Sequence, residues 1–285
     1  MIVRDARADD LGAVYDVWYA TETDGIDPVP PPRTMPWFDH LVRVGRLVVA
    51  VDDGVVVGFA GALDHGRCVA LSDLFVRPER QSQGIGAALL DDVLPPDRPL
   101  VTMASADRRA VASYVRRGMR PRWPAYYVAA AAEAIRSPRA LARQDVAPLP
   151  PADYPWQLPG DDAHYARLGA CPLVVAERGR TIGTALVVTG SPQRLAHPSA
   201  TEVLESSAYD ASDAEQLVLA VVGHVLAEGA TMVIVQVPGP HGALRPLLDR
   251  GFAITDVDVA CASEDGLLAD PARHTMHGES RIALD

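Results

Sequence analysis

LSDLFVRPERQSQGIGAALL, residues 71–90, is the stretch on which the fold of this chain depends. Its first six residues are mostly apolar and predict a strand, which Pro78 ends. A short polar loop follows. Gly84 and Gly86 then open an apolar helix that Pro95 ends.

A strand, a glycine turn and a helix N-terminus together form an anion-binding site. Glycines let backbone N–H groups approach a ligand, and a helix start adds unpaired N–H donors and roughly half a positive charge. We therefore expect this turn to bind a pyrophosphate. Two other phosphate loops do not fit, because the chain has no Gly-Lys-Ser/Thr and because Leu89 stands where a dinucleotide fingerprint needs its third glycine.

The stretch resembles the acyl-CoA loop of the GNAT N-acetyltransferase family. That loop reads Gln/Arg-x-x-Gly-x-Gly/Ala after a strand ending in Val-x-Pro, and residues 76–86 read VRPERQSQGIG. The segment 105–119 resembles the family's Asn-x-x-Ala-x-x-x-Tyr-x-x-x-Gly-Phe, with Asp107 in place of Asn and Met119 in place of Phe. An ordinary strand–loop–helix connection with two glycines is the competing interpretation.

The second half of the chain resembles the first. PLVVAERGRTIGTALVV (172–188) resembles RLVVAVDDGVVVGFAGA (46–62), and HGALRPLLDRGF (241–252) resembles RRAVASYVRRGM (108–119). Between these blocks we expect a strand over 201–209 and a helix over 214–228. Their connecting loop, DASDAEQ, has no glycine and adds acid, so it would repel a pyrophosphate.

We therefore expect an α/β (α+β) protein of two tandem GNAT-like domains, each a mixed, mostly antiparallel central sheet flanked by helices. Residues 1–136 would form the acetyl-CoA-binding catalytic domain, 137–159 a linker with a short helix over 138–144, and 160–285 a degenerate domain. In the first domain the patterns predict helices over 7–18 and 35–44 and strands over 2–3, 47–51, 55–63, 67–76 and 100–104.

Composition limits the function further. A net charge of −11 argues against nucleic-acid or anionic-membrane partners and mildly favours a cationic substrate, although solubility alone also explains it. Three cysteines without CxxC spacing and a charged N-terminus indicate a cytoplasmic protein. Every basic residue apart from histidine is Arg, which hints at a GC-rich bacterial genome. We expect no bound metal, since His274 and His277 alone are weak evidence for a metal site. We expect the protein to be a monomer or a homodimer.

The resemblance implies a mechanism with acetyl-CoA as cosubstrate, held between the strands 71–76 and 100–104. Backbone N–H groups near Phe75 or Val76 would polarise the thioester, a substrate amine would attack it directly, and Tyr114 would protonate the leaving thiolate. Simple packing is the alternative for Tyr114. The implied cofactor-binding residues are Leu74, Phe75, Val76, Gln81, Ser82, Gln83, Gly84, Ile85, Gly86, Ala87, Asp107 and Tyr114.

A general base is needed because an amine is protonated at neutral pH. Asp73 is the first choice, although Ser72 stands where some relatives carry Glu. His65 and Asp64 are second choices, and a water relay is a competitor. Candidates for the acceptor pocket, each of which could equally be a core tryptophan or a solvated acid, are Trp18, Glu22, Asp24, Asp27, Trp37 and Asp73.

Two classes of function remain open at this point. The first is an N-acetyltransferase acting on a primary amine of a small molecule, with a protein-lysine acetyltransferase as a variant. The second is a non-catalytic acyl-CoA-binding or scaffold protein. A deep pocket walled by the second domain would favour a small acceptor, and a broad open groove would favour a protein.

Overall fold

The computed structural model describes residues 1–24, 35–136, 144–191, 194–276 and 284. The strands of the first half are β1 (Ile2–Asp5), β2 (Arg46–Asp52), β3 (Val55–Asp64), β4 (Val69–Val76), β5 (Leu100–Ser105) and β6 (Arg120–Ala131). Those of the second half are β7 (Asp145–Pro148), β8 (Cys171–Glu177), β9 (Arg180–Thr189), β10 (Thr201–Ala208), β11 (Met232–Pro238), β12 (Ala253–Ala262) and β13 (His274–Thr275).

The helices of the first half are α1 (Leu11–Glu22), α2 (Pro36–Val44), α3 (Ile85–Val93) and α4 (Arg108–Val115). Those of the second half are α5 (Asp161–Arg167), α6 (Ala214–Ala227) and α7 (Leu244–Asp249). The expected elements are present with ends shifted by a few residues, and the largest change is in the first helix, whose start is a 3-10 turn at Ala8–Asp10. In the expected linker, β7 and a 3-10 helix (Pro151–Asp153) are formed, whereas residues 138–143 lie outside the described residues.

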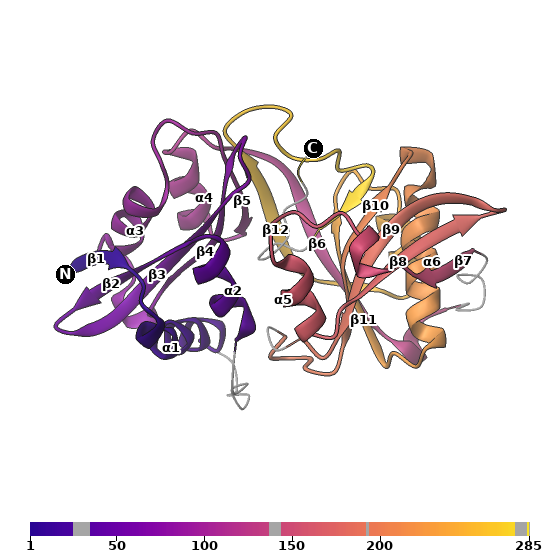
Figure 1. Ribbon diagram of the computed structural model, residues 1–285, viewed down its shortest axis with the longest axis horizontal. Coiled ribbons are helices and arrows are strands. Elements are labelled where there is room, and N and C mark those ends of the chain that lie inside the picture. Colours follow the sequence, from indigo (N-terminus) through magenta and orange to yellow (C-terminus); the bar gives the residue numbers. More distant parts are fainter. Residues whose placement is uncertain (25–34, 137–143, 192–193, 277–283, 285) are drawn as a thin grey trace.

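One mixed, mostly antiparallel sheet of 13 strands passes through both halves, in the order β1-β2-β3-β4-β5-β12-β6-β11-β10-β9-β8-β7, with β13 paired to β10 (Figure 1). The halves exchange their last long strands at its centre. β12 of the second half pairs antiparallel with β5 of the first, and β6 of the first pairs antiparallel with β11 of the second. Because β12 and β6 also pair with each other, the two tandem domains share a continuous backbone ladder.

Helices cover both faces of the sheet in each half. In the first half α1 and α2 pack on one face, around Trp18, Phe38 and Phe59, and α3 and α4 pack on the other, around Leu89 and Tyr114. In the second half α6 and α7 cover one face, and α5 belongs to a smaller cluster with Leu186 and Val188.

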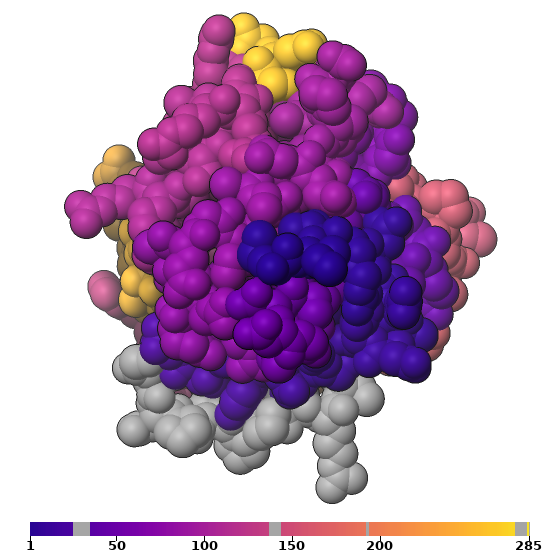
Figure 2. All heavy atoms as spheres, turned by 90° about the vertical axis from the view of Figure 1, so that its left-hand side faces the viewer, coloured from indigo at the N-terminus to yellow at the C-terminus, as the bar shows by residue number. Residues whose placement is uncertain are grey.

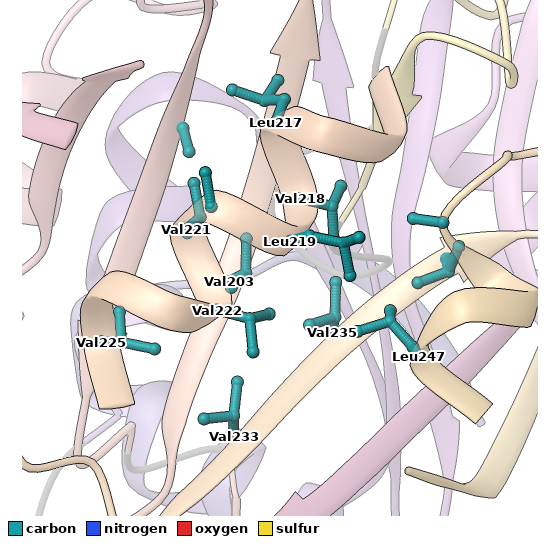
Figure 3. Packing of buried hydrophobic residues seen from close by; sticks show 14 of the residues in the cluster. Val203, Leu217, Val218, Leu219, Val221, Val222, Val225, Val233, Val235 and Leu247 are labelled. Atoms are coloured by element: carbon teal, nitrogen blue, oxygen red, sulfur yellow. The ribbon is translucent and has the colours of Figure 1, made fainter. Parts of the chain in front are cut away.

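The core of the second half is built from small and medium aliphatic side chains. Figure 3 shows Val218 and Val222 of α6 turned toward Val235 of β11, with Leu247 of α7 beside them. Nine of the fourteen residues of α6 are buried, so this helix is apolar nearly all round. Each fully buried Val or Leu stabilises the fold by about 1.5–3 kcal/mol, which lets a chain with few aromatics form a core.

The sheet ends in the first half at the short strand β1, seen in indigo in Figure 2. Ile2 is 68% exposed there. Arg4 forms a bidentate ion pair with Asp10 at 2.7 and 2.9 Å, and a short, charged edge strand discourages pairing with another chain. None of the described helices has the length and apolar composition needed to cross a membrane.

The strand exchange predicts that the first half cannot fold normally by itself. A chain ending at Arg143 loses β12 and leaves long edges of β5 and β6 open, so we expect aggregation or non-cooperative unfolding in size-exclusion chromatography and thermal melts. Residues 1–134 joined by a short Gly-rich turn to 251–263 should recover a monodisperse protein, since Ala253 lies opposite Ala129 in the antiparallel ladder. A chain ending at Arg143 that melts like the full protein would contradict this.

Candidate active site

A pocket opens where β4 and β5 separate. These parallel strands pair only at Val69–Leu71 with Leu100–Thr102, and the Thr102 hydroxyl donates to the Leu71 carbonyl at 2.9 Å. A β-bulge lies at this point, since Asp73 is opposite Gly61 while Leu71 is opposite Ala62, which leaves Ser72 as the extra residue. A bulge bends its strand and increases the local twist. The resulting pocket has a volume of about 520 Å³.

Most of the predicted site residues line this pocket. They are Glu22, Asp73, Leu74, Phe75, Val76, Gln81, Ser82, Gly84, Ile85, Gly86, Ala87, Asp107 and Tyr114. The residues of the sequence motifs therefore line the pocket that the separation of β4 and β5 creates.

The glycine loop forms one end of the pocket. Gly84 is the N-cap of α3 with φ +83°, a conformation that L side chains rarely adopt. Gly86 has an ordinary backbone, and a Cβ there would meet only Val76 Cγ2 at 3.9 Å, so the protein's own packing does not require glycine. The first N–H groups of α3 lack intrahelical acceptors, and the loop therefore offers donors and open space to an anion.

Two arginines stand beside this loop. Gln81 donates from Nε2 to the Val76 carbonyl at 3.2 Å and accepts from Arg109 Nη2 at 3.2 Å. Arg80 lines the same end of the pocket and forms an ion pair with Asp52. Both guanidinium groups are paired with carboxylates, Arg80 with Asp52 and Arg109 with Asp107 at 2.7 Å, and both line the pocket beside the loop.

Asp107 is the N-cap of α4 and accepts from the Arg109 backbone N–H at 2.8 Å. The side-chain hydrogen bond from Arg109 lowers the pKa of Asp107, and so it is ionised at neutral pH. Asp thus supplies the capping oxygen that an Asn would supply at this position.

Tyr114 of α4 is 5% exposed and lines the pocket. Among the described residues its hydroxyl has no hydrogen-bond partner. Burial raises the pKa of Tyr114 far above its usual value, with Cys261 adding to the effect. The hydroxyl therefore keeps its proton at all physiological pH values and is available as a donor inside the pocket.

Asp73 is buried at the bulge, with 4% of its surface exposed. It accepts a hydrogen bond from Trp37 Nε1 at 3.0 Å. Burial raises the pKa of Asp73 to about 6, and the hydrogen bond from Trp37 opposes that rise. Gly61 leaves room for this arrangement, because a Cβ there would lie 2.4 Å from Leu41 Cδ2 and 3.1 Å from Asp73 Oδ2.

Residues of the second half complete the pocket, and the sequence analysis did not identify them. Asp256 and Asp258 come from β12, and Asp258 accepts from the Tyr127 hydroxyl at 2.9 Å. Arg194 lies over the Tyr127 ring at 4.8 Å and donates to Glu202 at 2.5 Å. No local pattern marks these residues, because tertiary contacts bring them to the first half: the exchange of β12 for Asp256 and Asp258, and the segment between β9 and β10 for Arg194.

Three further carboxylates line the pocket, Glu22 of α1 and Asp256 and Asp258 of β12. Burial raises the pKa of Glu22, and Asp256 and Asp258 raise it further, while Arg194 works in the opposite direction. Burial is the largest of these effects on the pKa of Glu22, and the opposing effect of Arg194 is larger than that of either aspartate.

Several predicted residues lie elsewhere. His65 and Asp64 sit in the turn at the far end of β4, where Asp64 pairs with Arg98 at 2.9 Å, so the geometry does not support them as the base. Trp18 is a core residue packed on Phe38. Trp37 lies behind Asp73 and does not line the pocket, nor do Asp24 and Gln83. Asp27 lies outside the described residues.

The corresponding cleft of the second half is filled by the chain itself. β10 and β11 pair in parallel only over Thr201–Val203 and Val233–Val235. Beyond that point β13 pairs with β10 at Ser206 and Ser207, in the register that Leu74 and Phe75 occupy in β4.

The acidic loop of the second half is also unlike the glycine loop. It forms a 3-10 turn (Ala211–Asp213) in which Asp210 accepts from the Ser212 N–H at 2.8 Å and Asp213 pairs with Arg180. In the part of the chain that the structure describes, no group of three or more His, Cys, Asp or Glu is arranged to hold a metal, and His277 lies outside that part.

Comparison with known proteins places this fold and site in a family. Residues 13–119 match the model of the Acetyltransferase (GNAT) family. The whole chain has the fold of a tandem GNAT protein. No curated protein matches the chain significantly.

Three solved structures illustrate the shared fold. One is a glucosamine N-acetyltransferase region of a fungal multi-domain β-N-acetylglucosaminidase, with a TM-score of 0.66 at 18% identity. The match covers 91% of this chain and 38% of that chain, so this chain spans well under half of that protein. A Pyrococcus horikoshii protein assigned provisionally as an acetyltransferase has a TM-score of 0.68 at 14% identity, over 98% and 95%. A tandem GNAT protein from the clavulanic acid biosynthesis pathway has a TM-score of 0.61 at 17% identity, over 92% and 97%.

The buried carboxyl of Asp73 predicts a pH-dependent gain in stability when it is replaced. The pKa of Asp73 is about 6 in the folded state against its ordinary value of 3.8, so the folded state binds more protons between these values and its stability falls as pH rises through them. Asp73→Asn removes this cost while keeping an acceptor for Trp37. Urea unfolding should show the variant gaining up to about 3 kcal/mol over wild type at pH 7.5 and little near pH 4.

The matched control is Asp249→Asn, whose side chain is 69% exposed. Its difference from wild type should stay within about 0.5 kcal/mol across the same pH range. An Asp73→Asn variant that is destabilised by the same amount at every pH would show that the carboxylate is not under this strain.

Proposed function

We propose that this chain is an N-acetyltransferase that transfers an acetyl group from acetyl-CoA to a primary amine of a small molecule. The observation that carries the proposal is one pocket, at the separation of β4 and β5, whose wall contains the glycine loop, a protonated Tyr114 and a buried Asp73. Residues 1–136 would catalyse the reaction, with residues 160–285 completing the pocket.

The loop residues 81–87 would hold the pyrophosphate of acetyl-CoA. The α3 N-terminus supplies backbone donors, and Arg80 and Arg109 supply positive charge beside it. From there the pantetheine arm would run along the edge of β4 that has no strand partner beyond Leu71 in the described chain. Backbone N–H groups near Phe75 or Val76 would then polarise the thioester carbonyl.

Asp73 suits the role of general base, because a pKa of about 6 leaves it ionised at neutral pH and basic enough to accept a proton. It would take the proton from the ammonium form of the acceptor. The amine nitrogen then forms a bond to the carbonyl carbon and loses a second proton to solvent, and the bond from that carbon to sulfur breaks. Tyr114 would give its proton to the leaving thiolate and recover one from solvent.

The acceptor would be a small cationic amine. Glu22, Asp256 and Asp258 line the pocket, and carboxylates there would favour a ligand that brings positive charge. Walls contributed by β12 and Arg194 of the second half support a small molecule over a protein lysine. The three cysteines are all free, which fits a reducing compartment such as the cytoplasm.

Titration calorimetry with acetyl-CoA tests the cofactor. We expect one equivalent to bind per chain, and Gly84→Glu to abolish binding, because the new carboxylate would stand among the donors of the loop. Gly179→Glu is a matched control, since Gly84 and Gly179 both have φ near +80° and open space around Cβ. It should bind like wild type.

Two outcomes of this titration would count against the proposal. Wild type that fails to bind millimolar acetyl-CoA would remove the acetyltransferase interpretation. Two equivalents per chain would contradict the closure of the second cleft by β13.

Tyr114→Phe tests the general acid. The hydroxyl has no protein partner, so we expect unchanged folding and acetyl-CoA affinity but roughly a 10²-fold loss of transfer to a diamine in a thiol-release assay. Tyr126→Phe, on β6 and outside the pocket wall, should retain the wild-type rate. Equal rates for Tyr114→Phe and wild type would mean that water protonates the thiolate.

A further inference from the structure

Buried aromatic and imidazole rings join the two halves where α2 meets α5, which lie side by side in Figure 1. His40 of α2 stacks on His164 of α5 with ring centroids 4.3 Å apart and planes 15° apart. Trp37 of α2 contacts both imidazoles, at 5.9 and 6.0 Å between ring centroids. Each of the three side chains is at most 4% exposed.

A carboxylate lies at each end of this cluster. Asp161, the first residue of α5, contacts His40 Nε2 with Oδ1 at 2.9 Å and accepts from the Leu158 N–H with Oδ2 at 3.0 Å. At the other end Trp37 Nε1 donates to Asp73 at 3.0 Å. A continuous path of contacts therefore leads from the second half to the carboxylate in the pocket.

We infer that His40 and Asp161 are positioning residues, which fix the indole of Trp37 so that its N–H stays on Asp73. The second half thereby orients the carboxylate of the first half, in addition to lining the pocket with β12. Describing Asp73 as the general base rests on the proposed function, whereas the positioning contact itself does not.

Three features of the packing support this role. His40 lies three residues after Trp37, so their side chains meet on one face of α2. The bond to Asp161 prevents the His40 ring from turning away. Burial lowers the pKa of His164 to about 3, with His40 contributing, so a neutral ring completes the stack. The cluster leaves the Trp37 ring little freedom to rotate.

The titratable and charged groups around this path must be considered in any pH experiment. Those lining the pocket with Asp73 are Glu22 on α1, Arg80 after β4, Asp107, Arg109 and Tyr114 at or on α4, Asp256 and Asp258 on β12, and Arg194. Those near the imidazoles are Asp161 and Arg167 on α5 and Arg43 on α2. The variants below change none of the pocket groups, so a changed Asp73 titration would come from Trp37.

The test follows the Trp37 indole N–H by NMR in the full-length protein without acetyl-CoA or acceptor. The chain has four tryptophans, and Trp37→Phe identifies the resonance. In wild type we expect its proton shift to titrate with a midpoint near pH 6, as Asp73 ionises. In His40→Ala the midpoint should rise by about one pH unit, because losing a donor to the carboxylate favours its neutral form.

Matched variants separate positioning from general loosening. His40→Gln, which retains a donor for Asp161, should return the midpoint toward wild type, and Tyr165→Phe on the same helix α5 should leave it unchanged. Asp161→Asn weakens the same contact with little change of shape and decides the question if His40→Ala does not fold. A wild-type midpoint in whichever of these two variants folds would overturn the inference.

The readout needs no catalysis, so the two proposals fail in different ways. A protein that binds no acetyl-CoA but shows the shifted midpoint would refute the proposed function and retain the positioning role. An active enzyme in which the Trp37 indole titrates with the same midpoint in wild type and His40→Ala would support the proposed function and refute the positioning role. In an active enzyme the acidic limb of kcat/KM should move with the indole midpoint.

Discussion

Antiparallel pairing of β12 with β5 and β6 is the interaction on which the rest of this structure depends. Without it, the sheet of the first half would end at an open edge beside its own pocket. The exchange satisfies the backbone groups of β5 and places Asp256 and Asp258 of the second half in the pocket wall. One set of hydrogen bonds therefore both joins the halves and completes the site.

The pocket itself forms because two parallel strands diverge. β4 pairs with β5 for three residues and then departs, and the bulge at Ser72 turns the following residues out of register. The same bulge buries Asp73 among apolar groups at the cost of a raised pKa. Stability is thus given up at the position where a basic carboxylate is useful, which is common at functional sites.

The second half supports the first and has lost the features of an open cleft. β13 fills the separation of β10 and β11, and an acidic turn replaces the glycine loop. Its remaining contributions to the pocket are structural and electrostatic, through β12, Arg194 and α5. A duplicated domain has in this way become the wall and the support of its neighbour's site.

The local part of the site could be predicted from sequence. Gly84, Gly86 and the strand before them lie within one short segment, and Asp107 and Tyr114 lie on one helix start, so neighbouring residues alone fix their geometry. His65 shows the limit of that reasoning. A hydrogen bond across the turn joins the His65 N–H to the Cys68 carbonyl, five residues before Asp73, so roughly 16 Å of extended chain separates His65 from Asp73.

The sequence by itself determined the elements, the repeated architecture and the anion-binding loop, because hydrophobic period, glycine conformation and helix capping are local properties. The tertiary structure alone decided which strand stands beside β5, which carboxylates of the second half line the pocket and which helix packs against Trp37. Those outcomes depend on backbone pairing and ring packing between residues more than 100 positions apart, such as Tyr127 with Asp258 and His40 with Asp161. No short-range pattern encodes such contacts.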